Sequence, residues 1–242
     1  MNRHPRLAPA IATVICLCFA GCDALPGRPG AGEREVAASE VMTFDPLYRR
    51  NCAGCHGADG RLGAARPLND PLYLALVPPD RLHSIIDKGV PGTSMPAFGM
   101  VAGGDLTDAQ IDALAQGLLD RWGRPQVVND LTLPSYDAPG VESGPADQSH
   151  GAAVYGLVCA RCHGPQGRGG PKGGAIADPS YLALVSDQSL RTTVIAGRSD
   201  LGCPDWRSNL PARPLTSEDI ADVVAWLASR RQAVPGRVGQ GR

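Results

Sequence analysis

The chain has 242 residues, and its 23 Lys and Arg nearly balance its 24 Asp and Glu, which excludes a nucleic-acid binder held by bulk positive charge. Hydrophobic residues make up 43%, so the chain is not wholly disordered, and no apolar run reaches the roughly 18 residues of a membrane-spanning helix. Aromatic residues are only 5%, whereas 30 Gly and 22 Pro exceed a fifth of the chain, which predicts a small side-chain core that a bound group would fill.

The first 21 residues predict an export signal. Arg3 and Arg6 form a basic start, and the stretch 8–20 that follows is mostly apolar. It is too short to span a bilayer, which is typical of a cleaved signal peptide. We therefore expect residues 1–21 to be removed and the protein to be exported.

The end of this signal resembles a bacterial lipobox. The motif Phe19-Ala20-Gly21-Cys22 predicts that Cys22 carries a lipid, and Asp23 resembles the signal that keeps some lipoproteins on the inner membrane. An ordinary signal peptide cut nearby is the alternative. Residues 22–39, rich in Gly, Pro and charge, predict a flexible tether, so we expect a protein anchored on the periplasmic side of the inner membrane.

The rest of the chain is an internal repeat. Residues 69–77 match residues 177–185 at seven of nine positions, and a tyrosine precedes a cysteine by four residues in both copies. The predicted division is domain 1 at 40–124, a linker at 125–146 rich in Pro, Asp, Ser and Gly, domain 2 at 147–232, and a tail at 233–242.

Each copy predicts a small helical domain. A first helix opens at Asp45-Pro46 in one copy and at Asp147 in the other. Middle helices are predicted over 80–88 and 187–196, ending at the glycines Gly89 and Gly197. The last helices begin at Thr107, with Gln110 completing a capping box, and at Thr216, with Asp219. No alternating strand pattern appears, so the predicted class is all-α.

Four of the eight cysteines form two identical motifs, Cys52-Ala53-Gly54-Cys55-His56 and Cys159-Ala160-Arg161-Cys162-His163. The pattern C-x-x-C-H is the c-type haem attachment signature: two thiols on one short turn add to the vinyl groups of a porphyrin, and the histidine binds its iron. A thioredoxin-like redox pair would not need the histidine. A single zinc site would have to join motifs that lie more than a hundred residues apart.

The second axial ligand differs between the copies. In the first, Met95 lies in a loop rich in Gly and Pro, where a thioether can reach the iron from the other face; Met100 is a nearby competitor. The second copy contains no methionine, and 108 positions after Met95 the same loop carries Cys203.

Cys203 is therefore predicted to bind the second iron as thiolate, which would favour ferric iron and lower the potential of that haem. The alternatives are a free thiol beside a five-coordinate haem, or a haem bound by another side chain of this copy, His150 or Lys172.

These motifs resemble those of di-haem c-type cytochromes built from two class-I-like cytochrome c domains. The resemblance implies an all-α fold of two tandem domains, each around one covalently attached haem, that carries electrons between membrane complexes. It assigns to haem one Cys52, Cys55, His56 and Met95, and to haem two Cys159, Cys162 and His163. Cys203 departs from the usual methionine. The implied partners are a membrane quinol-oxidising complex and a terminal oxidase or other redox protein, with no nucleic acid.

A different class of function is an enzyme. Cys-ligated haem is found in sulfur-oxidising proteins resembling thiosulfate dehydrogenases, in which that haem is the active site. Three arginines near the Cys203 loop, Arg191, Arg198 and Arg207, would attract a sulfur oxyanion. Each copy is close to the minimal size of a cytochrome domain, however, so we assign no catalytic residue and prefer an electron carrier. A third possibility is a haem-based redox or gas sensor, but we recognise no signalling segment attached to the two copies.

Overall fold

The computed structural model describes residues 36–128, 132–138, 145–207 and 213–232. The chain divides into two compact units, Met1–Glu40 and Val41–Arg242. Of the first unit only residues 36–40 are described, and they contain the short 3-10 helix η1 (Ala38–Glu40). The predicted signal peptide and Cys22 lie outside the described residues. Among the residues that are described, no helix is both long and apolar enough to cross a bilayer.

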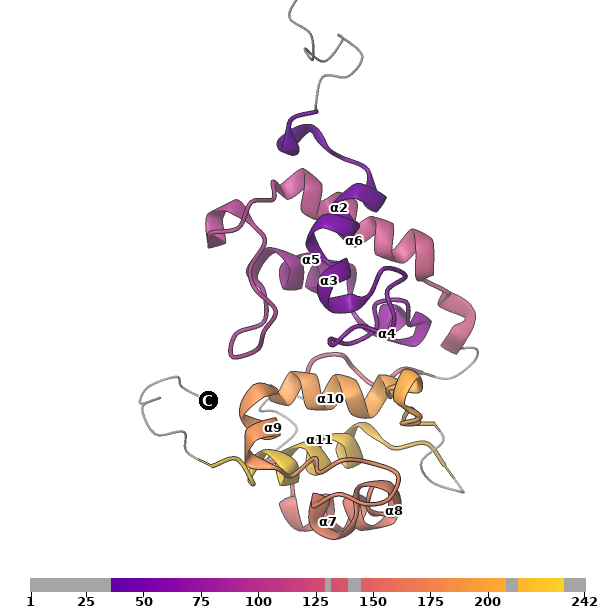
Figure 1. Cartoon of the computed structure of the whole chain (residues 1–242). Coiled ribbons are helices and arrows are strands. Elements are labelled where there is room, and N and C mark those ends of the chain that lie inside the picture. Colours follow the sequence, from indigo (N-terminus) through magenta and orange to yellow (C-terminus); the bar gives the residue numbers. More distant parts are fainter. Residues whose placement is uncertain (1–35, 129–131, 139–144, 208–212, 233–242) are drawn as a thin grey trace, which may run out of the picture. The chain divides into compact units, whose positions relative to one another are not determined.

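The second unit is helical throughout its described part (Figure 1), which contains no strand and only two isolated bridges. Its first repeat contains α2 (Phe44–Asn51), α3 (Ala53–His56), α4 (Pro71–Leu76), α5 (Pro79–Lys88), η2 (Met100–Ala102) and α6 (Asp108–Trp122). The second repeat contains α7 (Gln148–Val158), α8 (Ala160–His163), η5 (Pro165–Gly167), α9 (Pro179–Leu184), α10 (Asp187–Ala196), η6 (Ser199–Leu201) and α11 (Ser217–Ala228), and the 3-10 helix η3 (Pro125–Val128) lies between the repeats. The all-α prediction agrees with this architecture.

Most of the predicted helix boundaries are confirmed. The middle helices α5 and α10 end at Gly89 and Gly197, both of which have positive φ. The capping boxes of α6 and α11 are both formed, and Asp147 caps α7 by accepting hydrogen bonds from two backbone N–H groups. The start of α2 was predicted wrongly. Thr43 is the N-cap, with extended backbone, and Asp45 lies in the first turn.

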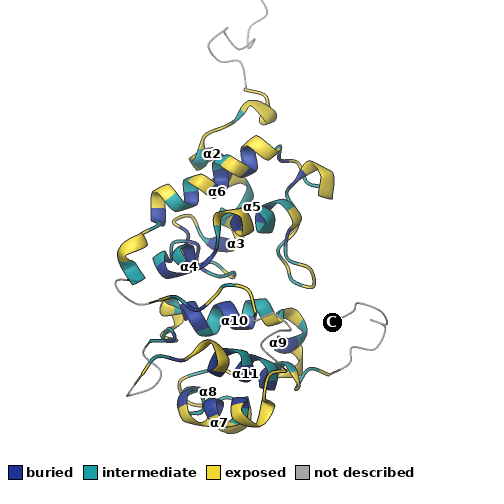
Figure 2. Ribbon diagram, turned by 180° about the vertical axis from the view of Figure 1, so that it is seen from behind, coloured by how far each residue is buried: buried dark blue, intermediate teal, exposed yellow. Residues whose placement is uncertain are grey.

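In each repeat the first helix packs against the last through a tyrosine–tryptophan pair. The ring centroids of Tyr48 and Trp122 lie 5.2 Å apart, nearly perpendicular, and those of Tyr155 and Trp226 lie 4.4 Å apart. All four residues are buried, and the helices that carry them have both buried and exposed residues (Figure 2). Because α2 and α7 run directly into the haem-attachment motifs, this packing fixes the position of the first attachment cysteine in each repeat.

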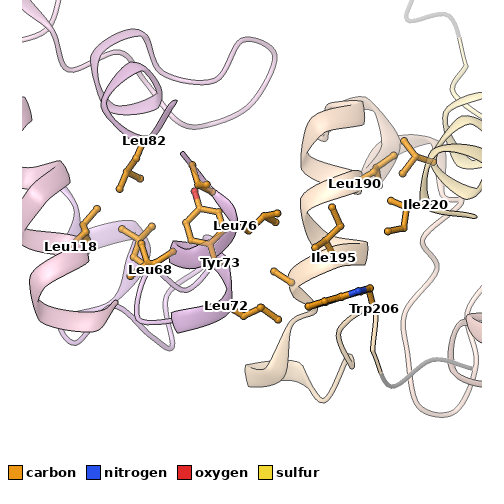
Figure 3. Packing of buried hydrophobic residues seen from close by; sticks show 14 of the residues in the cluster. Leu68, Leu72, Tyr73, Leu76, Leu82, Leu118, Leu190, Ile195, Trp206 and Ile220 are labelled. Carbon is orange, nitrogen blue, oxygen red and sulfur yellow. The ribbon is translucent and has the colours of Figure 1, made fainter. Parts of the chain in front are cut away.

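The repeated segment at 69–77 and 177–185, for which the sequence predicted no structure, forms the short helices α4 and α9. Asp70 and Asp178 cap them by accepting hydrogen bonds from the backbone of the first turn. Helix α4 presents Leu72 and Leu76 toward Ile195 of α10 (Figure 3), and all three belong to the same cluster of buried residues. The two repeats therefore share one hydrophobic core within the second unit.

Ser135 and Tyr136 of the predicted linker are bound to the second repeat, whereas the next residue, Asp137, pairs with Arg81 of the first repeat. The carbonyl oxygen of Ser135 accepts hydrogen bonds of 3.1 and 2.8 Å from the Arg191 guanidinium, and the Tyr136 carbonyl accepts one of 2.8 Å from Gln188. These are two successive carbonyls, so this stretch of backbone is held against α10 at two points.

Candidate functional site

The two attachment motifs form the same short turn. The N–H groups of Cys55 and His56 donate to the Cys52 carbonyl at 3.1 and 2.9 Å, and the N–H groups of Cys162 and His163 make bonds of the same lengths to Cys159. None of the five described cysteines forms a disulfide, so the four motif thiols are available for attachment to vinyl groups. Burial, with a smaller contribution from a neighbouring thiol, raises the pKa of Cys52 and of Cys159 to about 12.

Both motif histidines are oriented by a backbone carbonyl. His56 Nδ1 lies 2.7 Å from the Arg66 carbonyl oxygen, and His163 Nδ1 lies 2.8 Å from that of Gly174. Because a carbonyl only accepts, each Nδ1 must carry the hydrogen, which leaves Nε2 with its lone pair for a metal. This is the arrangement that fixes ring and tautomer in metal-bound histidines, so both imidazoles are prepared to bind iron.

Two tyrosine hydroxyl groups make hydrogen bonds beside the motifs. These bonds were not predicted from the sequence. The hydroxyl of Tyr48 donates to the Gly57 carbonyl at 2.8 Å, and the hydroxyl of Tyr155 donates to the Gly164 carbonyl at 2.7 Å. Each acceptor glycine directly follows the motif histidine and has positive φ. The recurrence of the tyrosine four residues before the first cysteine was the available signal. These bonds fix the chain where it leaves the motif.

The loops that carry Met95 and Cys203 share two backbone hydrogen bonds but differ at one N–H: that of Met95 donates to Thr93 Oγ1, whereas that of Cys203 donates to the Arg198 carbonyl. The Met95 carbonyl accepts from the N–H of Val90 at 3.1 Å, and the Cys203 carbonyl accepts from the N–H of Arg198 at 3.0 Å. The loops also end alike, because the N–H of Leu106 donates to the Phe98 carbonyl and that of Leu215 to the Trp206 carbonyl. The backbone thus supports the sequence offset that equates Met95 with Cys203.

The glycine that ends each middle helix packs against these loops. A Cβ on Gly89 would stand 2.6 Å from the Met95 carbonyl oxygen, and a Cβ on Gly197 would stand 2.7 Å from that of Cys203. Only glycine combines this close approach with the positive φ observed at both positions. The close approach defines where Met95 and Cys203 lie relative to α5 and α10.

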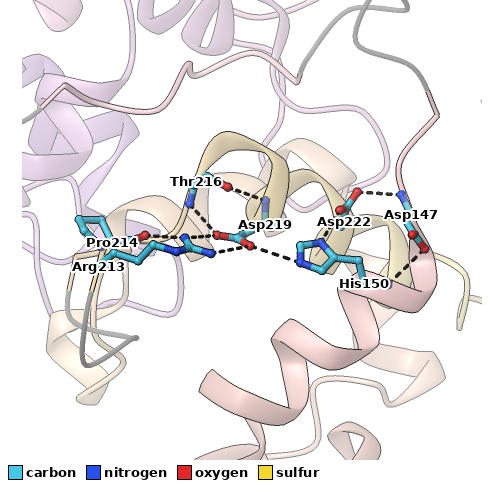
Figure 4. Close-up of polar contacts among 7 residues, drawn as sticks. All are labelled: Asp147, His150, Arg213, Pro214, Thr216, Asp219 and Asp222. Carbon is cyan, nitrogen blue, oxygen red and sulfur yellow. Dashed lines mark hydrogen bonds and ion pairs between the residues drawn. The ribbon is translucent and has the colours of Figure 1, made fainter.

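The competing side chains lie in less suitable places. Met100, in η2, is 63% exposed, whereas Met95 is partly buried, which favours Met95 as the ligand. Lys172 is exposed. His150 is bound elsewhere (Figure 4): its Nδ1 lies 2.7 Å from the Asp222 carboxylate, and its Nε2 lies 3.6 Å from that of Asp219.

The Cys203 thiol has only one weak polar contact among the described residues, 3.8 Å from the Pro204 carbonyl oxygen. Burial raises the pKa of this thiol, and the neighbouring Cys162 raises it further, while the N–H of Arg198 lowers it. A bound metal ion would offset the burial by stabilising the thiolate.

The arginines considered for an oxyanion site have other partners. Arg198 binds the Asp200 carboxylate at 2.7 Å, and Arg207 binds that of Asp205 at 2.8 Å. Arg191 was expected near the Cys203 loop, but its Nε and one Nη donate to Ser135 of the linker. Arg198 and Arg207 are thus paired with carboxylates of their own loop, whereas the buried Arg191 keeps one Nη without a partner among the described residues.

Two helical repeats, each presenting a C-x-x-C-H motif and a correctly oriented histidine, define a c-type cytochrome with two haem centres. Residues 39–116 match the family model "Cytochrome C oxidase, cbb3-type, subunit III", and residues 148–231 match the model "Cytochrome c". The chain therefore belongs to the di-haem c-type cytochromes, with tandem all-α cytochrome c domains and two covalently bound haems that contain iron.

Its relatives are, by their names, subunits of a cbb3-type cytochrome c oxidase and of a cytochrome bc1 complex. The chain is 28% identical over 193 residues to the cbb3-type cytochrome c oxidase subunit CcoP of Cereibacter sphaeroides, covering 75% of this chain and 58% of that protein. It is 24% identical over 236 residues to the cytochrome bc1 complex cytochrome c subunit of Mycobacterium bovis, covering 94% of this chain and 78% of that protein. The chain thus spans less than two thirds of the length of the first relative and about four fifths of that of the second.

One solved structure, a chain of the reducing HAO-like protein complex of Kuenenia stuttgartiensis, aligns with 82% of this chain and 98% of its own length. The TM-score is 0.45 at 17% sequence identity.

The residues present fit two c-type haems. In each repeat two free thiols, a histidine with Nε2 available and a sulfur-bearing loop residue come from equivalent elements. The pair of sulfur residues is unequal, since one is the thioether of Met95 and the other the thiol of Cys203.

Proposed function

We propose that the protein is an exported, membrane-tethered electron-transfer subunit. It passes single electrons between a respiratory or photosynthetic membrane complex and an acceptor. His56 and Met95 would bind the iron of haem one, and His163 and Cys203 that of haem two. The observation that carries the proposal is that the Met95 and Cys203 loops share two backbone hydrogen bonds. In each loop a glycine also packs against the carbonyl of the proposed ligand.

Bound haem iron supplies a one-electron couple, and the chain sets its properties. The carbonyls of Arg66 and Gly174 hold the protons on the Nδ1 atoms of the two motif histidines, which makes Nε2 a better donor. The Met95 thioether stabilises ferrous iron, whereas the Cys203 thiolate stabilises ferric iron. The two centres would therefore have different potentials, and the Met95 centre would have the higher one.

The N-terminal motifs and the relatives support the proposed location. Both named relatives are subunits of respiratory complexes, which supports a quinol-oxidising complex or a terminal oxidase as partner. A lipid on Cys22, joined to domain 1 (40–124) by residues 22–39, would hold domain 1 and domain 2 (147–232) at the periplasmic surface of the inner membrane.

The experiment is electron exchange with membranes of the source organism. Membranes supplied with a quinol should reduce the purified full-length protein, and oxygen should reoxidise it through the membranes' own oxidase. The variant Cys22→Ala should appear in the soluble periplasmic fraction instead of the membrane fraction. Absence of reduction by quinol-supplied membranes would contradict the proposal.

Cys203 in the axial loop also favours a second candidate, a sulfur-compound oxidoreductase similar to thiosulfate dehydrogenases. The ion pairs of Arg198 and Arg207 weigh against it, because both cations are already neutralised by carboxylates of their own loop. Turnover of thiosulfate or tetrathionate with an artificial electron acceptor distinguishes the two: turnover supports the enzyme, and none supports the carrier.

A further inference from the structure

Arg66 serves both repeats at once. Its backbone carbonyl oxygen lies 2.7 Å from His56 Nδ1 in the first repeat. Its guanidinium reaches the end of α10 in the second repeat, where one Nη donates to Thr193 Oγ1 at 2.6 Å and the other to the Gly197 carbonyl at 3.3 Å. One residue thus holds the motif histidine of haem one with its backbone and the second repeat with its side chain.

The end of α10 is also the support of the Cys203 loop. Gly197 packs against the Cys203 carbonyl, and the next residue, Arg198, exchanges two hydrogen bonds with Cys203, each 3.0 Å long. The Arg66 side chain is therefore bonded to the residue that contacts Cys203 directly. Three contacts in succession therefore connect His56 to Cys203: the His56 ring with the Arg66 carbonyl, the Arg66 guanidinium with the Gly197 carbonyl, and Gly197 with the Cys203 carbonyl.

The environment of Arg66 favours one fixed position of its side chain. The guanidinium is half-buried, lies 5.3 Å from the centre of the Tyr73 ring, and makes no ion pair with any described carboxylate. Its acceptors are the last turn of α10 and the C-cap carbonyl, where the helix dipole favours a cation. Two divergent acceptors and one aromatic face suit the planar fork of arginine better than a lysine ammonium.

We infer that Arg66 is a positioning residue that couples the two haem centres, because it ties the carbonyl that orients His56 to the segment that supports Cys203. The inference rests on the proposed ligand set. Loss of the side-chain contacts would leave both ends less firmly held, so a change made in one repeat should alter the haem potential of the other.

The sharpest test is Thr193→Val, made in the second repeat without changing any charge. It removes the Arg66 acceptor Oγ1, and we expect the midpoint potential of haem one to shift in a redox titration of the full-length protein followed by spectroscopy. The control is Thr192→Val, because Thr192 Oγ1 bonds only within α10, to Gln188, and does not contact Arg66. A shift of haem two alone, or equal shifts with both variants, would overturn the inference.

Variants of Arg66 separate position from charge. Arg66→Gln should lower both potentials, because a lost cation disfavours the ferrous form and the contacts are lost with it. Arg66→Lys keeps the charge but cannot satisfy both acceptors, so we expect both potentials still to shift. The control is Arg61→Gln in the same loop, whose guanidinium bonds to Asn69 of its own repeat. If Arg66→Lys keeps the wild-type potentials and the two Gln variants shift them equally, Arg66 acts only through its charge, and the inference that it positions other groups is wrong.

The coupling and the ligand assignment are tested by different measurements. The ligation of haem two is read from the wild-type protein by electron paramagnetic resonance. The transmission from Thr193 to haem one is read from the potential of the other centre. A wrong ligand for haem two and a missing coupling would therefore be seen as separate results.

Discussion

Gly197 lies so close to Cys203 that a Cβ on the glycine would stand 2.7 Å from the cysteine carbonyl oxygen. The same relationship joins Gly89 to Met95 in the first repeat, at 2.6 Å. Each middle helix thus ends against the backbone of the residue that we propose as axial ligand. The position of the ligand loop is determined by backbone packing and does not depend on whether the ligand is methionine or cysteine.

The variant Gly197→Ala should therefore disturb haem two. Alanine is strained at φ +72°, at a cost of about 1 to 3 kcal/mol, and its Cβ would push the Cys203 carbonyl away. We expect lower stability and loss of the wild-type axial ligation, measured by urea unfolding and by the haem-two spectrum.

The matched control is Gly202→Ala. Gly202 has nearly the same φ, +73°, but a Cβ there would meet nothing within 4 Å. Its ψ of 14° places it in the left-handed helical region, whereas Gly197 has ψ −168°, so alanine at Gly202 should be less strained and should keep the ligation. If both variants keep the wild-type haem spectrum, the close contact at Gly197 does not position the ligand.

Replacing Cys203 by methionine should raise the potential of haem two and leave haem one nearly unchanged. A thioether donates less electron density than a thiolate, so the ferric form loses its stabilisation. Redox titration of Cys203→Met measures both potentials in one experiment. Unchanged potentials at both haems would show that Cys203 is not a ligand.

The complementary variant is Met95→Ala, which should convert haem one to a high-spin form with a lower potential while haem two keeps its spectrum. The control is Met100→Ala, because Met100 is 63% exposed and lies outside the proposed ligand set. If Met100→Ala gives the spectral change and Met95→Ala does not, the assignment of the two methionines must be exchanged.

Helix ends were predictable where a local signal determines them. The capping box of Thr107 with Gln110 and the glycine ends at Gly89 and Gly197 depend on neighbouring residues alone, and all were predicted correctly. The position of Cys203 was also predictable, because a repeat lets one half of the chain serve as an alignment for the other.

Structure that depends on packing was not predictable. Helix α4 is only six residues long, too short for a hydrophobic period, although Asp70 followed by Pro71 is a recognisable start signal. The bonds from Arg66 to α10 and from Arg191 to Ser135 join residues 131 and 56 positions apart along the chain. Nothing local in the sequence specifies such partners.

The second repeat should lose stability as the pH rises above neutrality. The hydrogen bond to Asp222 raises the pKa of His150 above its usual value, and the charges of Asp222, Asp219 and Glu218 act in the same direction. A raised pKa in the folded state means that the stabilisation is complete below about pH 6.5 and is lost as the pH rises through the raised value.

The measurement is urea unfolding followed by the haem-two signal between about pH 6 and 9, compared with His150→Gln, in which this part of the pH slope of the midpoint should be absent. His83→Gln is the control, since His83 faces Asp112 in the first repeat at 3.3 Å and should leave the second repeat's profile unchanged. An unaltered slope in His150→Gln would assign the pH dependence to other groups.

The most direct test of the account is an electron paramagnetic resonance spectrum of the fully oxidised protein, quantified per haem. A low-spin, thiolate-type signal equal to half of the total haem, beside a His/Met-type signal for the other half, is the result we predict for Cys203 and Met95 as ligands. A spectrum containing only His/Met-type or high-spin haem would remove Cys203 from the iron and contradict the proposal of two unequal centres.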